Sequence, residues 1–211
     1  EQWRRGTFDA YWEQLGIYAA GSYDTLPKIP VMLMSSWYDA YVHTTFDNYA
    51  GLRRDPQRAV EVIMGPWTHG NRNATAFGDV DFGHAASFDG NVAVNWIAHR
   101  RQWFDRWLKP DAPKDAAALR VRVFLMGGGS GRKTAAGKLD HGGRWLGATD
   151  WPLPNAQSRS YYLEPEGGIA LAVPTLADAR DDYDFDPRDP VPTIGGALTS
   201  GKYGPSWHRI S

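Results

Sequence analysis

The sequence predicts an α/β segment over about residues 29–112, followed by an all-β segment over about residues 119–211. Three observations carry this prediction. A strand–helix–strand pattern occupies the first segment, and a proline-rich stretch separates the two segments. Short apolar runs between Gly and Pro turns, with no convincing helix, fill the second segment. The expected fold class is therefore α/β plus all-β.

Residues 1–28 precede both segments and carry a helical pattern. Aromatic and apolar residues recur there at three- and four-residue steps, namely Trp3, Phe8, Tyr11, Trp12 and Leu15. Gly16, Gly21 and Pro27 then break the pattern. We expect helix that ends before the first strand.

A strand, a helix and a second strand follow within roughly 35 residues, which is typical of a βαβ unit in a parallel sheet. Residues 31–34 form an apolar run after Pro30, as expected of a strand buried on both faces. Residues 59–64 predict a second buried strand. Residues 44–53 predict the helix between them. Its inner side is expected to consist of Phe46, Tyr49, Ala50 and Leu52.

The rest of the α/β segment predicts a loop and a long helix. Residues 70–90 are rich in Asn, Asp and Gly, which is typical of a loop. Residues 92–109 predict a helix whose wide apolar arc should pack on the sheet. This arc combines a stripe with flanking residues, namely Val92, Trp96, Trp103 and Trp107 with Ile97, Phe104 and Leu108.

The character of the chain changes after the proline-rich residues 110–118, which predict a linker. Residues 120–125 begin with strict alternation and predict a strand, and residues 160–163 predict another before a Pro/Gly turn at 164–168. Short strands of this kind favour an antiparallel sandwich. We expect the two segments to pack through an apolar interface, because the chain has 10 Trp to bury and the linker is short.

Composition excludes several classes of function. Lys+Arg 23 against Asp+Glu 24 leaves no basic excess for nucleic acid, so no nucleic-acid partner is expected. No apolar run of about 18 residues is present, so no membrane partner is expected. The lack of Cys removes disulfides, thiolate catalysis and Cys-bound zinc. It fits a reducing compartment, and we expect a cytoplasmic location.

Two polar side chains follow the two strands of the βαβ unit. Asp39 lies just beyond the first strand, and His69 lies just beyond the second. Reactive groups of open α/β sheets lie past the carboxyl ends of the strands, and neighbouring strands are about 4.8 Å apart. We expect the two side chains within about 4 Å of each other, with Asp39 accepting the Nδ1 proton of His69 and Nε2 left as a general base.

The order of the residues is that of an α/β-hydrolase triad, in which Ser precedes Asp and Asp precedes His. The Ser is missing, because no Gly-x-Ser-x-Gly occurs in the sequence and residues 127–131 have the wrong spacing. Structural roles remain open: Asp39 as a turn or cap residue, and His69 as a hydrogen-bonded loop residue. A metal site of Asp39, His43 and His69 has no supporting spacing.

A run of acidic residues offers a further alternative. Alternating acids can bind Ca²⁺, but the EF-hand spacing is not met here and a solvated strand face is favoured. The residues concerned are Asp181, Asp182, Asp184, Asp186 and Asp189.

An ordered set of segments resembles the CocE/NonD family of serine hydrolases, the group of the X-prolyl dipeptidyl peptidases. The set begins with a WYD motif that contains Asp39 and a GPWTH motif that contains His69. A helix and several β segments follow in the same order as in the family. The matching segments are residues 37–39, 65–69, 101–109, 121–127, 142–145, 151–153 and 183–193. One departure is Ser35 and Ser36, where relatives often have two glycines.

The resemblance implies a domain organisation. Residues 1–28 would be the end of a helical cap segment, and residues 29–112 the C-terminal part of an α/β-hydrolase core. Residues 119–211 would be an incomplete jelly-roll β-sandwich. The chain starts at Glu1 rather than Met, and we expect it to be a piece of a longer protein whose missing N-terminal part is its partner.

The resemblance also implies a function. Asp39 would be the triad acid, His69 the triad base and Tyr41 an aromatic near the acyl pocket, while the Ser and the oxyanion donors would lie upstream. The expected reaction is hydrolysis of acyl esters, or of peptide bonds in the manner of an X-Pro dipeptidyl peptidase. Small esters or short peptides would be the substrates, with no metal or cofactor. The sequence leaves a homo-oligomer open.

One alternative function belongs to another class. A Trp- and Tyr-rich β-sandwich can bind ligands without catalysis, here attached to an inactive hydrolase-like core.

Overall fold

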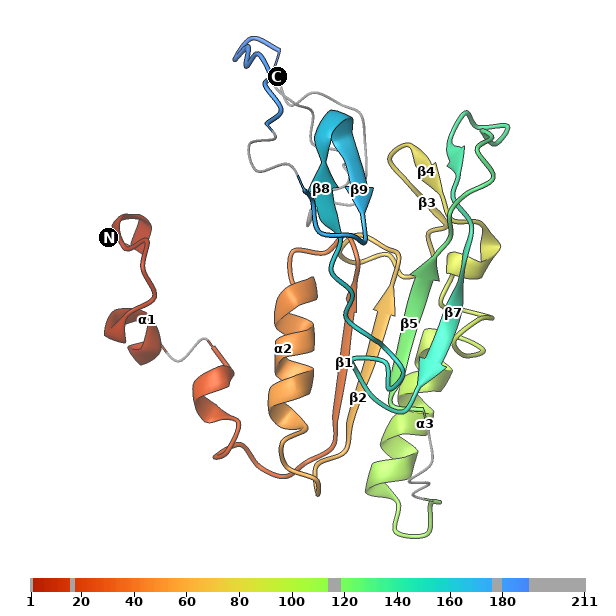
Figure 1. The fold of residues 1–211 in the computed structure, drawn as a ribbon. Coiled ribbons are helices and arrows are strands. Elements are labelled where there is room, and N and C mark those ends of the chain that lie inside the picture. Colours follow the sequence, from red (N-terminus) through yellow and green to blue (C-terminus); the bar gives the residue numbers. More distant parts are fainter. Residues whose placement is uncertain (1, 16–17, 114–118, 176–179, 190–211) are drawn as a thin grey trace.

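The computed structural model describes the chain except residues 1, 16–17, 114–118, 176–179 and 190–211. Its centre is a four-stranded mixed sheet in the order β1-β2-β5-β7, flanked by helices α2 and α3 (Figure 1). The sheet strands are β1 (Val31–Ser36), β2 (Val60–Gly65), β5 (Val121–Met126) and β7 (Gly143–Ala148), and the helices are α2 (Val42–Leu52) and α3 (Trp96–Leu108). Mixed sheets with few helices agree with the α/β part of the prediction.

The remaining described elements are short. They are η1 (Gln2–Arg4), α1 (Ala10–Gln14), η2 (Ala20–Ser22), β3 (Ala76–Phe77), β4 (Val80–Asp81), η3 (His84–Ala86), β6 (Leu139–Asp140), β8 (Tyr162–Glu164), η4 (Pro165–Gly167) and β9 (Gly168–Ala170). The stretch 70–90, predicted as a loop, thus contains two short strands and a 3-10 turn. Two-residue strands leave no alternating pattern in a sequence.

The predicted βαβ unit is confirmed. Strands β1 and β2 pair in parallel, from Val31 beside Val60 to Ser36 beside Gly65, and α2 connects them. Strand β2 is buried along its whole length. The prediction that residues 31–34 are buried on both faces is wrong, since they are only half-buried. The reason is that β1 lies at the edge of the described sheet and has β2 as its one neighbour.

The strand predicted at 120–125 lies in the same sheet as β1 and β2. It is β5, which pairs in parallel with β2, and β7 pairs antiparallel with β5. We expected this strand to open a separate β domain, whereas the structure places it in the central sheet. Beyond β7 the described strands are the hairpin β8–β9, which agrees with the strand and turn predicted at 160–168. The jelly-roll sandwich stays a prediction, and residues 190–211 lie outside the described residues.

The side chains of alternate residues in the central strands belong to two apolar clusters, one on each face of the sheet. Val62 of β2 packs with Tyr49 of α2 on one face, and Ile63 of β2 packs with Phe88 on the other. Residues of β5 and β7 belong to both clusters, Val123 to the first and Phe124 to the second. The predicted apolar interface between the two segments is therefore confirmed.

Helix α2 buries a face that differs in part from the predicted one. Tyr49 and Leu52 are buried as expected, but Ala50 is exposed, and Thr45 and Gly51 are buried instead.

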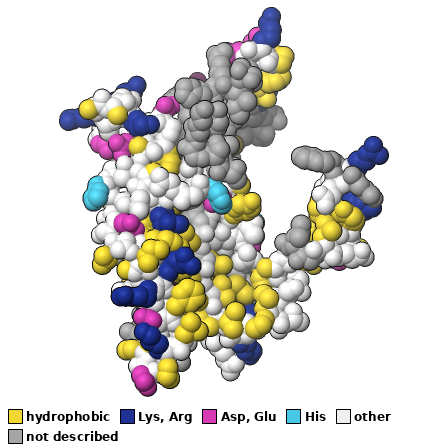
Figure 2. Space-filling model, turned by 180° about the vertical axis from the view of Figure 1, so that it is seen from behind, with side chains coloured by type: hydrophobic (Ala, Val, Ile, Leu, Met, Phe, Trp, Pro, Cys, Tyr) yellow, Lys and Arg dark blue, Asp and Glu magenta, His cyan; other side chains and the backbone are white. Residues whose placement is uncertain are grey.

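Helix α3 is shorter than predicted and contacts the sheet through a narrower strip. It begins after Asn95, whose side chain accepts a hydrogen bond of 2.8 Å from the backbone N–H of Ala98. His99 is its buried residue. The apolar residues expected to widen the contact, Ile97, Phe104 and Leu108, are exposed. Figure 2 shows hydrophobic side chains at the surface, interspersed with Lys and Arg.

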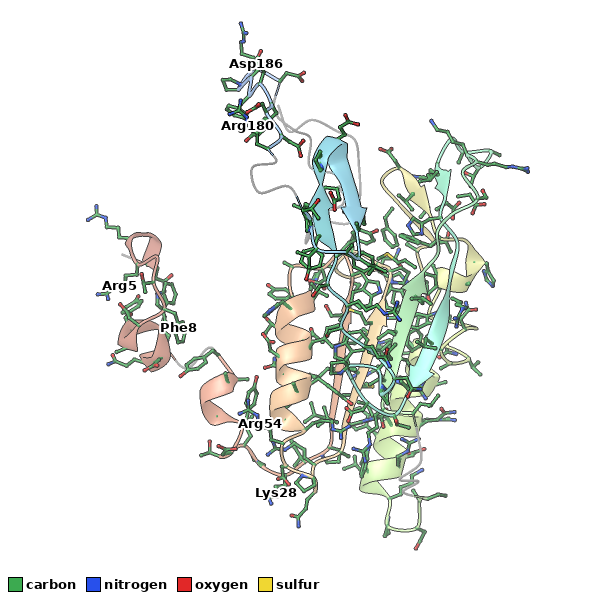
Figure 3. The ribbon with its side chains drawn as sticks, in the orientation of Figure 1. Arg5, Phe8, Lys28, Arg54, Arg180 and Asp186 are labelled. Carbon is green, nitrogen blue, oxygen red and sulfur yellow. The ribbon has the colours of Figure 1, made fainter. Side chains whose placement is uncertain are left out.

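Residues 2–15 form η1 and α1, which stand away from the sheet (Figure 1). Helix α1 contains no buried residue and lies apart from the sheet, in the region labelled by Arg5 and Phe8 in Figure 3. The Phe8 ring contacts the Tyr18 ring edge-on at 5.0 Å. The helical cap role of residues 1–28 stays a prediction.

Candidate active site

The turns after β1 and β2 are held together by backbone hydrogen bonds. The N–H of Trp37 donates to the Gly65 carbonyl at 2.8 Å, and the N–H of Tyr38 donates to the Trp67 carbonyl at 3.2 Å. The Trp37 indole N–H also donates to the Phe124 carbonyl of β5 at 2.7 Å. Hydrogen bonds therefore connect the two strand ends into one platform.

Asp39 and His69 meet on this platform. His69 Nδ1 lies 3.0 Å from Asp39 Oδ2. The Asp39 side chain is buried, whereas about half of the His69 side chain is exposed. The contact predicted from the strand ends is confirmed.

Asp39 has a hydrogen-bond donor for each oxygen. While Oδ2 faces His69, Oδ1 accepts a 3.0 Å bond from the backbone N–H of Tyr41. A buried carboxylate is stable only where such donors replace water. With Asp39 ionised, His69 carries its proton on Nδ1, and Nε2 has no partner among the described residues. This arrangement orients an imidazole that can take up a proton at Nε2 and then be stabilised as an imidazolium.

Tyr41 contacts the same histidine. Its ring stands edge-on to the His69 ring with centroids 5.8 Å apart, and it is more than half exposed. The structure thus brings Tyr41 to the acid–base pair, in addition to the support that its backbone gives Asp39. Contact with an acyl group stays a prediction.

A pocket of about 220 Å³ lies beside the pair and is lined by polar residues that sequence reasoning did not assign. Ser36 Oγ donates to the Thr68 carbonyl at 3.3 Å, tying the two turns together. The hydroxyls of Ser35 and Thr68 are buried without a partner in the described part of the chain. Arg72 also lines the pocket, and its guanidinium lies 4.5 Å from the Trp96 ring centroid. In the sequence, these lining residues were indicated only by Ser35 and Ser36, which stand where relatives often have two glycines.

The alternatives for other polar residues can be placed as well. His43 contacts Asp47 at 2.7 Å on the exposed side of α2. In the described ranges, His, Asp and Glu side chains form no group of three suited to a metal ion. Arg180 and Asp186 lie beyond the β8–β9 hairpin, far from the central sheet (Figure 3). Asp186 there pairs with Arg188 at 3.0 Å. No helix in the described ranges is long and apolar enough to cross a membrane.

Comparison with known proteins supports the resemblance. Residues 1–71 match the family model of the X-Pro dipeptidyl-peptidase (S15 family). The chain is 29% identical over 193 residues to cocaine esterase of Rhodococcus sp. (strain MB1 Bresler). The matched region covers 85% of this chain, and the chain spans 30% of the relative's length. The resemblance to the CocE/NonD hydrolases that the sequence predicts is confirmed.

Proposed function

From this kinship with the CocE/NonD and S15 hydrolases, we propose that the chain supplies the acid and the base of a Ser-His-Asp triad. Asp39 is the acid and His69 the base. The observation that carries the proposal is the 3.0 Å contact between His69 Nδ1 and a buried carboxylate at adjacent strand ends. The half-exposed imidazole leaves Nε2 accessible to a reacting group.

The reaction is acyl transfer to water. A serine hydroxyl attacks the carbonyl carbon of an ester or amide, and His69 Nε2 takes up the hydroxyl proton. The tetrahedral intermediate collapses as His69 returns that proton to the leaving alcohol or amine. Water then attacks the acyl-enzyme, His69 acting again as base and then as acid, and the carboxylic acid is released. Asp39 stays ionised and holds the imidazole in place.

The nucleophile is proposed to come from a segment outside these 211 residues. No Gly-x-Ser-x-Gly motif occurs in the sequence, and the matched region covers 30% of the relative. Acyl esters and X-Pro peptides are the proposed substrates, because the names of the relatives point to an ester and to X-Pro dipeptides. Tyr41 is proposed to contact the acyl group, since its exposed ring borders His69.

The test compares the longer polypeptide with the 211-residue chain. The longer polypeptide should hydrolyse p-nitrophenyl acetate or an X-Pro p-nitroanilide and should react with a fluorophosphonate. His69→Ala should abolish both. His43→Ala is the matched control, because it removes another histidine with an aspartate neighbour, one far more exposed, and should change neither rate.

The chain of 211 residues should by itself give no fluorophosphonate label. Stoichiometric labelling of this chain, with turnover that His69→Ala removes, would place the nucleophile inside it and overturn this part of the proposal. Ligand binding without turnover in the longer polypeptide would instead favour the binding-module alternative.

A further inference from the structure

A second pocket lies between helix α3 and strands β2 and β5. Its volume is about 280 Å³, and it shares no lining residue with the pocket beside His69. Glu61 of β2 and Arg122 of β5 form its floor, and His99, Trp103 and Arg106 of α3 line it from the helix side. The apolar residues 92–94 complete the wall.

Two residues that line this pocket each have a buried ring nitrogen without a partner in the part of the chain described. His99 is 8% exposed, and its Nε2 atom is buried without a hydrogen bond in the part of the chain described. The Trp103 indole Nε1 is in the same situation. Buried donors are nearly always paired in folded proteins, so two orphan nitrogens in one pocket point to a ligand.

The charges in the pocket leave one cation uncompensated. Glu61 is the one acid of the lining, and its Oε1 accepts a 3.0 Å bond from Arg106 Nη1. Arg122 is half-buried and makes no hydrogen bond or ion pair with a described residue. Burial, with smaller contributions from Arg122 and Arg106, holds the pKa of His99 below its usual range. At neutral pH His99 is therefore an uncharged partner beside a free guanidinium.

We propose that this pocket binds a small carboxylic acid with an apolar body. An indole N–H and a guanidinium can only donate, so their complement is an anionic acceptor. A carboxylate matches the planar guanidinium with two parallel bonds, and its second lone pairs can accept from Trp103 and His99. The apolar part of the ligand would contact residues 92–94 and the Trp103 ring.

The test uses the chain of 211 residues and follows the Trp103 indole N–H by ¹H–¹⁵N NMR, assigned with Trp103→Phe. Benzoate should shift this resonance saturably at pH 7. Benzamide, which keeps the shape without the charge, and inorganic phosphate should bind at least tenfold more weakly. Arg122→Gln should weaken benzoate binding at least tenfold. Arg101→Gln, at an exposed position of α3 outside the pocket, should leave benzoate binding unchanged.

Other outcomes overturn the proposal. Equal affinity for benzoate and benzamide would show that the charge is not recognised, and unchanged binding in Arg122→Gln would remove the cation from the site. If Arg122→Gln fails to fold, calorimetry on Trp103→Phe replaces it, with weaker benzoate binding expected and unchanged binding contradictory. If a blocked glutamate peptide binds more tightly than benzoate, the pocket recognises a glutamate side chain of a protein. The proposal of a small free acid would then be wrong.

Discussion

The Asp39 carboxylate is held at both oxygens, and this fixes the direction in which it presents its charge. Rotation about its last bond would break the bond from the Tyr41 N–H or the contact with His69. A buried carboxylate that loses such a bond is not rescued by water, because the side chain is only 8% exposed. The imidazole is therefore oriented before any substrate binds.

Replacing Asp39 by Asn tests that orientation. The Asn amide can donate to Nδ1, which favours the tautomer with the proton on Nε2 and removes the general base. We expect Asp39→Asn to lower kcat of the longer polypeptide by about 10⁴. In the 211-residue chain, the low-field NMR signal of the His69 Nδ1 proton should disappear.

Asp47→Asn provides the control for this change. It removes the carboxylate beside His43 on the exposed side of α2 and should leave kcat unaltered. A loss of less than tenfold in Asp39→Asn would show that Asp39 only shapes the turn.

His99 predicts a pH dependence of folding. Its pKa is lowered from 6.5 by burial first and by Arg122 and Arg106 second, so the folded chain binds this proton more weakly than the unfolded chain. The stability is then complete above about pH 6.5 and falls as the pH drops through the lower folded pKa. His99→Gln should remove this part of the pH dependence, measured as the change in the urea midpoint between pH 7.5 and 5.

The exposed His43 is the comparison, because it lies on the solvent side of α2. The His43→Gln variant should lose as much stability between pH 7.5 and 5 as the unaltered chain does. If His99→Gln and the unaltered chain lose the same stability on acidification, the proton uptake occurs elsewhere.

The single-residue predictions succeeded where a simple rule applied. Asp39 and His69 could be predicted because the ends of parallel strands coincide in space, and two strands are visible in sequence. Ser35, Thr68 and Arg72 could not be predicted, because the pocket they line depends on side-chain packing between loops. His99 lies in an apolar helix pattern, and nothing in that pattern reveals its unpaired nitrogen.

Helix α2 is held against the preceding segment by a close approach at Gly51. A Cβ atom at this position would overlap the ring of Tyr23, whose hydroxyl donates to Asn48 Oδ1 at 2.8 Å. A side chain here would push the helix from Tyr23. The burial of Gly51 on the inner side of α2 thus has a steric reason.

Gly51→Ala should therefore destabilise the fold, although alanine favours a helix by about 1 kcal/mol. Overpacking costs about 1–3 kcal/mol and should decide the sign. The measurement is the free energy of unfolding in urea. In a Tyr23→Ala background the same substitution should be neutral or stabilising. Equal effects in both backgrounds would show that Tyr23 is not the obstacle.

Some elements were beyond sequence reasoning. The segment Val121–Met126 alternates like a half-buried strand, and a proline-rich stretch precedes it, so a new domain was the natural interpretation. Its place beside β2 depends on long-range pairing, which alternation cannot specify. The exposed Ile97 and Leu108 likewise show that an apolar arc gives the periodicity of a helix but not the width of its contact.

At the scale of the molecule, β5 joins the two halves into one sheet. It lies between β2 and β7, and the Trp67 and Trp145 rings from the two halves are 5.6 Å apart. We expect β1, β2, β5 and β7 to unfold together. Native-state hydrogen exchange should give their slowest amides the same free energy of opening.

A substitution in β5 sharpens this prediction. Val123→Ala removes buried methyl groups and should lower the opening free energy of amides in β1 and β2 as much as in β7. Leu163→Ala, at an exposed position of β8, should change none of them. If the opening free energy falls only for amides of β5 and β7, the two halves unfold independently.

Strands β1 and β2 pair in register up to their carboxyl ends. This register suggests how similar acid–base pairs can be found in other sequences. Asp39 lies three residues past Ser36 and His69 four past Gly65, and these offsets set their meeting point. The stretch between them, residues 40–68, includes an exposed turn at Pro56 and Gln57, where an insertion should be tolerated without moving either side chain. A pattern search should therefore count outward from each strand end and leave the linear gap between acid and base free.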